Sequence, residues 1–300
     1  MNLLRPLVQL TPLAALCAAL PALATNGMLM EGYGPVSTGM GGASQAFDHG
    51  TAAMAQNPAT LALMPTRARH DAALGVLGPK VASSMAGMGS AESDGTSYVM
   101  PALGYARRTG SLIYGFGLFA QGGMGTEYGA DSFLAMGSGN PVRSELGVGS
   151  LLFPLAWQAT PALLVAADVK RIAWSDVMKD FRLRYDSAGM GGSVSFALPQ
   201  NWKDQSVLNL GLAYAVGDQL TLRAGVNRSD NPIPDALVNP LFPATVKSHY
   251  TLGVGWRFSA TGELNGSLTV APTSTVTNGM GVVVTHKQTN FQIMYSRHFI

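Results

Sequence analysis

Strict alternation of apolar and polar residues is the feature that most limits what the second half of this chain can fold into. One run sets Tyr250, Leu252, Val254, Trp256 and Phe258 against His249, Thr251, Gly253, Gly255 and Arg257. The same pattern recurs in residues 208–214, 220–227, 263–270 and 291–299. A period of two predicts β-strands that have one apolar and one polar face.

Composition favours a barrel in a lipid bilayer over a soluble β-sandwich, which would show the same period. Charged residues make up 12% of the 300, against roughly 25% in a soluble domain. No apolar run in the body of the chain approaches the ~20 residues that a membrane helix needs. Aromatic residues recur near the predicted strand ends, as they do at the two interfaces of a membrane barrel. We therefore predict an all-β fold, an antiparallel transmembrane β-barrel.

The strand count depends on the first half of the chain, where the pattern is less regular. We expect strands at residues 72–77, 98–107, 112–120, 145–157, 163–173, 177–185 and 193–198. With the five strands of the second half they predict a barrel of twelve strands, within a range of ten to fourteen. Because periplasmic turns are short and outer loops long, we expect residues 121–142 and 228–246 to be outer loops, and Pro272 to begin another.

Residues 1–24 have the features of a signal peptide. Arg5 supplies a short positive region, residues 7–20 form an apolar core, and Ala22-Leu23-Ala24 is a small-x-small cleavage site. The mature chain would then begin at Thr25 and lack the only cysteine, Cys17. We therefore expect an exported protein without disulfides or a catalytic thiol.

A glycine-rich stretch follows soon after this segment. Residues 39–59 read GMGGASQAFDHGTAAMAQNPA, and Thr25-Asn26-Gly27 and Gly32-Tyr33-Gly34 precede them. Further along the chain come GGMGTEY at 122–128, WSDVM at 174–178, WKDQ at 202–205, NPIP at 231–234, and LFPA at 241–244 followed by His249. In this order the motifs resemble the FadL family of outer-membrane transporters for long-chain fatty acids and other hydrophobic compounds.

The resemblance implies a monomeric barrel in the outer membrane of a Gram-negative bacterium, with residues 25–65 folded as a hatch inside a barrel of residues 66–300. It implies passive uptake of a long-chain fatty acid or hydrocarbon ligand, which leaves sideways through the barrel wall. Other partners would be outer-membrane lipid and the barrel assembly machinery. Family barrels have fourteen strands and are longer than this chain, and the shortening would fall near residues 157–163.

Two groups of residues are candidates for the functional parts. The hatch motif comprises Gly39, Gly41, Gly42, Asn57, Pro58 and Ala59, because a segment packed inside a barrel needs irregular backbone and close approach. The ligand-binding candidates are Met40, Phe47, Met54, Met124, Arg223 and Arg257. Methionine adapts to varied apolar partners, and a lumen-side arginine could hold a carboxylate headgroup. The alternatives are that the methionines fill gaps and that the arginines pair with interior carboxylates.

Other functional classes have less support. The five histidines lack metal-ligand spacing and no Gly-x-Ser-x-Gly nucleophile motif is present, so we expect no enzyme activity, no metal and no cofactor. A net charge of +2 without a basic stripe gives no reason to expect nucleic acid. A general porin and an outer-membrane lipid-modifying enzyme remain as alternative functions.

Overall fold

The computed structural model describes residues 28–44, 47–160, 163–166, 180–187, 192–203, 207–229 and 231–299. The predicted signal peptide lies outside these residues, as do parts of the strands expected at 163–173 and 177–185. The proposed shortening near 157–163 falls at a hairpin whose residues 161–162 are likewise outside the described part.

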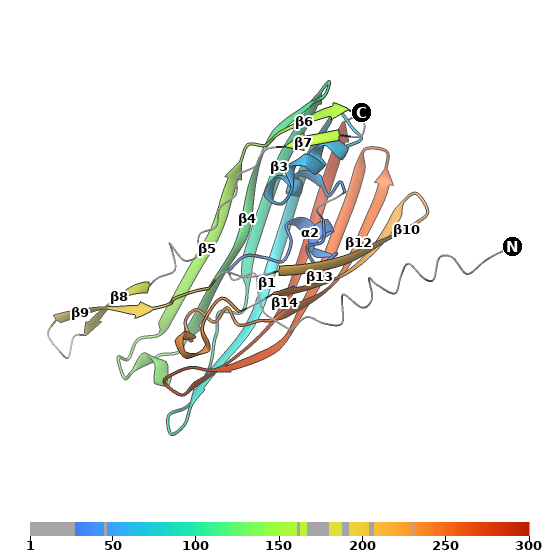
Figure 1. The fold of residues 1–300 in the computed structure, drawn as a ribbon. Helices are drawn as coiled ribbons and strands as arrows, with labels where there is room; N and C mark the ends of the chain where they lie inside the picture. The colour runs from blue at the N-terminus through green and yellow to red at the C-terminus, as the bar shows by residue number, and fades with distance from the viewer. Residues whose placement is uncertain are drawn as a thin grey trace.

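An antiparallel sheet forms the wall of the molecule (Figure 1). Its strand order is β10-β11-β12-β13-β14-β1-β3-β4-β6-β7, with β2 also paired to β1 and β5 to β4. The described strands are β1 Ala68–Met85, β2 Gly89–Glu92, β3 Tyr98–Thr109, β4 Leu112–Tyr128, β5 Val142–Leu152, β6 Leu155–Thr160, β7 Leu163–Ala166, β8 Asp180–Ser187, β9 Gly192–Pro199, β10 Val207–Val216, β11 Leu220–Ser229, β12 Ser248–Ser259, β13 Gly262–Thr277 and β14 Val282–Phe299. Strands β8 and β9 pair with each other in a separate hairpin.

The strand count falls within the predicted range of ten to fourteen once two interrupted strands are joined. Strands β2 and β3 pair with successive parts of β1, and β5 and β6 with successive parts of β4. Counted as single strands, they leave ten strands in the sheet and two in the β8–β9 hairpin of the described part of the chain. The break between β5 and β6, which the sequence did not predict, falls at Phe153-Pro154, because proline has no N–H for a ladder hydrogen bond.

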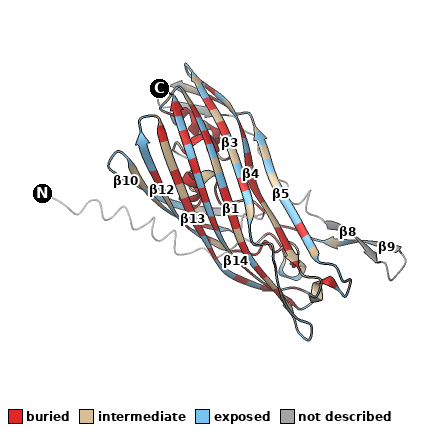
Figure 2. Cartoon of the chain, turned by 180° about the vertical axis from the view of Figure 1, so that it is seen from behind, coloured by how far each residue is buried: buried red, intermediate tan, exposed pale blue. Residues whose placement is uncertain are grey.

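The two faces of the wall are the reverse of those in a soluble sandwich. On β14, Phe291, Ile293 and Tyr295 are exposed, whereas Asn290 and Gln292, which alternate with them, are buried. Figure 2 shows this alternation of exposed and buried residues along the neighbouring strands. An apolar outer face and a polar interior are the pattern of a transmembrane barrel, so the all-β barrel prediction is confirmed. None of the described helices is long and apolar enough to cross a membrane.

The N-terminal segment, residues 28–44 and 47–64, lies within the curve of the sheet (Figure 1). It contains the helix α2 Gly34–Thr38 and the 3-10 helices η1 Gly50–Ala55 and η2 Pro58–Leu63. Helix α2 contacts β12, β13 and β14, while η1 contacts β1, β3 and β4, and η2 contacts β4, β6 and β7. One short segment therefore touches strands far apart in the sheet order, which means that the wall wraps around it.

Two predicted outer loops begin later than expected. The glycine-rich run after Ala120 was expected to leave the sheet, but β4 continues to Tyr128 with a bulge between Ala120 and Gly122. Strand β13 likewise passes Pro272 and ends at Thr277, with a register shift between Ala271 and Ser274. In both places a bulge accommodates residues that do not fit a regular ladder.

Candidate functional site

The wall opens between β3 and β4. Their ladder runs from Thr109/Leu112 to Ala102/Phe119 and stops there, although both strands are described beyond that point. Pro101, which has no N–H to donate, is the first β3 residue past the ladder. The next backbone hydrogen bond on this side of β4 comes from the segment between β2 and β3, where the Asp94 N–H donates to the Glu127 carbonyl oxygen at 2.8 Å. Between these points lies a gap in the backbone hydrogen bonding of the wall.

The start of the N-terminal segment pairs with β4 at this gap. Leu29 forms an antiparallel bridge with Gly122. The Met30 N–H donates to the Gln121 carbonyl oxygen at 3.0 Å, and the Gly123 N–H donates to the Met28 carbonyl oxygen at 2.8 Å. A Cβ at Gly122 would overlap that Met28 oxygen, so glycine is required for the approach. The β4 bulge thus turns backbone groups inward, where residues 28–30 satisfy them.

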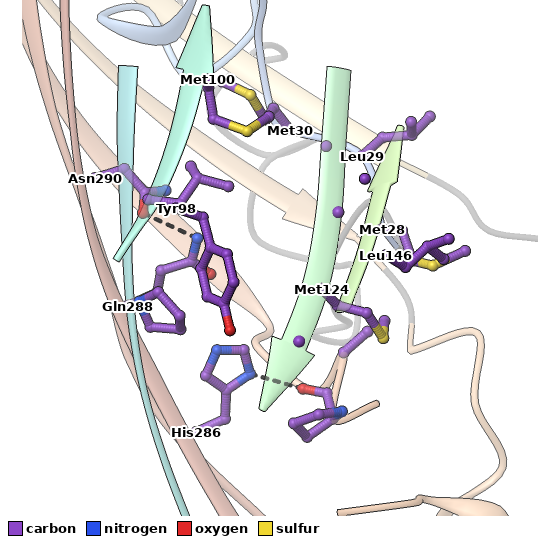
Figure 3. A pocket seen from close by; sticks show the side chains of 18 of the residues that line it. Met28, Leu29, Met30, Tyr98, Met100, Met124, Leu146, His286, Gln288 and Asn290 are labelled. Atoms are coloured by element: carbon purple, nitrogen blue, oxygen red, sulfur yellow. Dashed lines mark hydrogen bonds between the residues drawn. The ribbon is translucent and has the colours of Figure 1, made fainter. Parts of the chain in front are cut away.

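A cavity of about 190 Å³ lies beside this pairing (Figure 3). Four methionines from three parts of the chain line it: Met28, Met30, Met100 and Met124. Leu77, Val81 and Ala244 add to its apolar lining, and Glu31, His249, His286, Gln288 and Asn290 form a polar part. Val99 and Leu146 also line the cavity and are 62% and 37% exposed, so the cavity reaches the outer face of the wall.

A glycine turn fits the N-terminal segment against the far wall. Gly41 and Gly42 have φ angles of 64° and 86°, which favour glycine. A Cβ at Gly39 would lie 2.9 Å from the Cα of Gly253, and a Cβ at wall residue Gly225 would overlap the backbone of Met40. The N-terminal segment therefore approaches the wall closely at this turn, and the approach depends equally on glycines in the wall, while the role of Gly39, Gly41 and Gly42 in a hatch stays a prediction.

An ion-pair cluster holds the middle of the segment to β1. Arg69 Nε donates to the Asp71 carboxylate at 2.8 Å, and Arg69 Nη1 lies 3.4 Å from Asp48 Oδ2. Asp71 also accepts the Thr51 N–H at 2.7 Å. Arg69 and Asp71 are 4% and 5% exposed, so the segment and the wall share a buried charge network.

Burial lowers the pKa of His49, which lies next to this cluster. Its Nδ1 is 3.1 Å from the Phe47 carbonyl oxygen, while Nε2 is buried without a partner among the described residues. Loss of hydration disfavours the charged ring and outweighs the nearby carboxylates Asp48 and Asp71. Burial and the neighbouring Glu31 carboxylate raise the pKa of Tyr33, because both disfavour the charged phenolate. Both side chains are therefore neutral at neutral pH.

The end of the segment closes the opposite part of the interior with an apolar core. Met54 and Leu61 pack with wall residues Ile113 and Phe119, all of them at most 3% exposed. Asn57 precedes η2, and its Oδ1 accepts the Ala59 N–H at 3.2 Å, while Pro58 occupies the first turn. Arg108 donates to the carbonyl oxygens of Ala62 and Met64. Asn57-Pro58-Ala59 thus starts a buried 3-10 turn, and the first strand begins later, at Ala68.

Of the six predicted ligand-binding residues, the cavity includes one, Met124. Met40 lies in the glycine turn, Met54 in the apolar core, and Phe47 packs edge-on to His49 at 5.9 Å between ring centroids. Arg223 donates to Asn265 Oδ1 at 3.0 Å, and Asn265 in turn donates to Glu263. Arg257 is exposed. For all six residues ligand contact stays a prediction.

The sequence did not single out most of the cavity lining. Met100 and His286 lie on alternating strands and look like ordinary wall residues until the β4 bulge and the gap are known. The methionines Met28 and Met30 were a usable signal, since both precede the glycine-rich stretch. The described residues contain no group of three or more His, Cys, Asp or Glu side chains able to hold a metal ion.

An antiparallel wall, apolar outside and polar inside, that wraps around its own N-terminal segment defines a membrane-barrel fold with a filled interior. The profile of the family described as "Outer membrane protein transport protein (OMPP1/FadL/TodX)" matches residues 151–282. The predicted resemblance to the FadL family is confirmed.

Solved structures of this fold cover most of the chain. The toluene transporter TodX of P. putida is 22% identical with a TM-score of 0.67, over 90% of this chain and 99% of that one. A Pseudomonas aeruginosa FadL homologue is 12% identical with a TM-score of 0.64, over 91% and 100%. The Ralstonia pickettii toluene transporter TbuX is 21% identical with a TM-score of 0.61, over 90% and 99%. At these identities the likeness shows the fold.

One curated protein matches a short part of the chain. It is an uncharacterized protein encoded in the 5' region of the phosphoenolpyruvate carboxykinase gene of Chlorobium limicola. It is 54% identical over 52 residues, which span 17% of this chain and 26% of the relative.

Proposed function

We propose that this chain is an outer-membrane channel for the passive uptake of hydrophobic small molecules. The cavity beside the wall gap carries the proposal, because it combines a methionine-rich lining with access to the outer face. Thioether side chains adapt to apolar ligands of varied shape. The family description as a transport protein supports the same class and gives no reason to expect an enzyme.

The cavity volume suggests a ligand the size of one aromatic ring. An engineered apolar cavity of roughly 150 Å³ holds benzene, and the cavity here is about 190 Å³. The relatives TodX and TbuX are both named as toluene transporters, which supports a ligand of this size. A long-chain fatty acid would fit only with part of its chain outside the cavity, so we propose small molecules built on a single apolar ring as the ligand class.

We infer a sideways route for the ligand. The apolar core of Met54, Leu61, Ile113 and Phe119 closes the interior at one end, whereas the β3–β4 gap lies beside the cavity. Residues 28–30 pair with β4 at that gap, so their displacement would open it. In this proposal the N-terminal segment acts as a hatch. The chain then divides into a signal peptide (1–24), a hatch (25–65) and a barrel (66–300), and it works as a monomer.

A general porin is the second candidate, and it needs a water-filled passage. The buried N-terminal segment and its apolar core argue against one, since Met54 and Leu61 are 2% and 1% exposed. A porin would conduct small sugars and ions, whereas the proposed channel would not. Conductance therefore separates the two functions.

The test is uptake of radiolabelled toluene by proteoliposomes containing the full chain. Met124→Trp should fill the cavity and abolish the saturable part of the uptake. Met280→Trp is the matched control, because Met280 is 70% exposed and lies outside the cavity lining. Equal uptake by Met124→Trp and the unaltered protein, or conductance of small sugars, would overturn the proposal.

A further inference from the structure

The polar part of the cavity contains an unpartnered hydrogen-bond acceptor. His286 is 8% exposed, and its Nδ1 lies 2.7 Å from the Pro243 carbonyl oxygen. A carbonyl oxygen can only accept, so the Nδ1 atom carries the proton. In the neutral ring Nε2 then has a free lone pair. That Nε2 is buried and has no partner among the described residues, and His286 lines the cavity beside Tyr98 and Met124 (Figure 3).

A second histidine is oriented in the same way. His249 Nδ1 lies 2.9 Å from Asn227 Oδ1, and Asn227 Nδ2 donates to Asn209 Oδ1 at 2.7 Å. With its amide nitrogen used as a donor, Asn227 presents Oδ1 as an acceptor, so the His249 Nδ1 atom carries the proton. Its Nε2 is therefore also the lone-pair nitrogen. His249 and His286 come from β12 and β14 and line the same cavity.

A buried carboxylate adds negative charge to this part of the cavity. Glu31 is 4% exposed, and its Oε1 accepts the Thr269 hydroxyl at 2.7 Å. Within the described residues, no Lys, Arg or His side chain forms an ion pair with it. A carboxylate ligand placed here would meet a like charge and two ring lone pairs, and its burial would be costly.

One neighbouring amide can donate. Gln288 Nε2 donates to Asn290 Oδ1 at 2.9 Å, which leaves Asn290 Nδ2 as a donor on the cavity lining. A hydroxyl group can use both kinds of partner, since it donates one hydrogen bond and accepts others. A hydrocarbon can use neither and leaves His286 Nε2 unpaired, at the cost that a buried polar group carries.

We propose that the cavity is selective for single-ring molecules that bear one neutral hydroxyl group, the phenol class, over plain hydrocarbons and over carboxylates. The ring lies among Met28, Met30, Met100 and Met124, and the hydroxyl group donates to His286 Nε2. This rests on the proposed function, of which it specifies the ligand chemistry.

The experiment measures binding of para-cresol, para-xylene and benzoate to the purified full chain by calorimetry. Para-xylene has a methyl group in place of the hydroxyl of para-cresol, so the two molecules have nearly the same size and shape and only para-cresol can donate a hydrogen bond. We expect para-cresol to bind roughly tenfold more tightly than para-xylene, as one buried hydrogen bond allows, and benzoate to bind least. Para-xylene that binds as tightly as para-cresol, or benzoate that binds best, would overturn the selectivity. Absence of binding by all three would overturn the proposed function itself.

Two variants locate the acceptor. His286→Leu should remove the preference for para-cresol and leave para-xylene affinity unchanged or higher. His70→Leu is the control, because His70 is an exposed histidine on β1 and lies outside the cavity lining. Para-xylene binding by His286→Leu shows that the variant is folded, so a para-cresol preference that persists in it would contradict the assignment of His286.

Discussion

The two ends of the N-terminal segment are held in different ways. The upper part, residues 28–31, is joined to the wall by the two backbone hydrogen bonds at the β4 bulge, by the bond of Glu31 to Thr269 and by the packing of Met28 in a buried apolar cluster, without a buried ion pair among the described residues. The lower part, residues 48–64, has the buried Arg69 cluster and an apolar core. Weakly held segments open at low free-energy cost, whereas buried ion pairs and cores do not. The comparison suggests a movable upper part on an anchored lower part.

Breaking the charge cluster should have the largest effect, because it removes the ion pairs that distinguish the lower part from the upper part. Arg69→Ala leaves the Asp71 and Asp48 carboxylates without their cation, and loss of one partner of a buried pair costs about 3–5 kcal/mol. We expect a lower midpoint of thermal unfolding and faster proteolysis within residues 48–64. Arg107→Ala is the control, since Arg107 is exposed on β3. An unchanged midpoint would mean that the cluster does not anchor the lower part.

Truncation of a side chain in the apolar core should have the next largest effect on stability. Leu61→Ala removes a side chain that is 1% exposed, and such truncations cost about 2–5 kcal/mol. Leu63→Ala in the same 3-10 helix is the matched control, because Leu63 is 42% exposed. Denaturant titration of both variants measures the difference. Equal destabilisation of the two would contradict the assigned burial.

Acidification should loosen the lower part gradually and to a smaller extent. The pKa of His49 is lowered by burial from its ordinary value of 6.5, so the unfolded ring binds a proton more readily than the folded one. The contribution of neutral His49 to the free energy of unfolding is fully present above about pH 6.5, and it is lost as the pH falls below that value. The charged groups facing His49 are Asp48, Arg69 and Asp71. In His49→Phe this part of the pH dependence should disappear, which thermal unfolding at several pH values would measure.

Gly122→Ala should have the smallest effect on stability. Its main effect should be on the position of residues 28–30. The added methyl group overlaps the Met28 carbonyl oxygen, so residues 28–30 should leave β4 while the anchored part stays. Hydrogen exchange at the Met30 amide should accelerate, with little change in unfolding midpoint. Gly266→Ala is the control, because an added Cβ there meets nothing closer than 3.8 Å. Exchange that stays slow at Met30 would show that the upper part is not held at the gap.

The sequence predicted what depends on local pattern. Alternation identified β10 to β14, because each strand repeats the same choice of face over many residues. The prediction that the glycine-rich run after Ala120 forms a loop was wrong, because a bulge that turns backbone groups inward has the same local sequence pattern as a loop. The cavity depends on that bulge, so His286 and Met100 could not be singled out from their own strands.

The wall glycines have a consequence for the register in which the wall strands assemble. Gly225 and Gly253 lie on β11 and β12, late in the chain, and their missing side chains match the backbone of residues 39–41. Packing against the glycine turn can therefore set the register of β11 and β12, because a shift of one residue would place Val226 or Leu252 where only glycine fits.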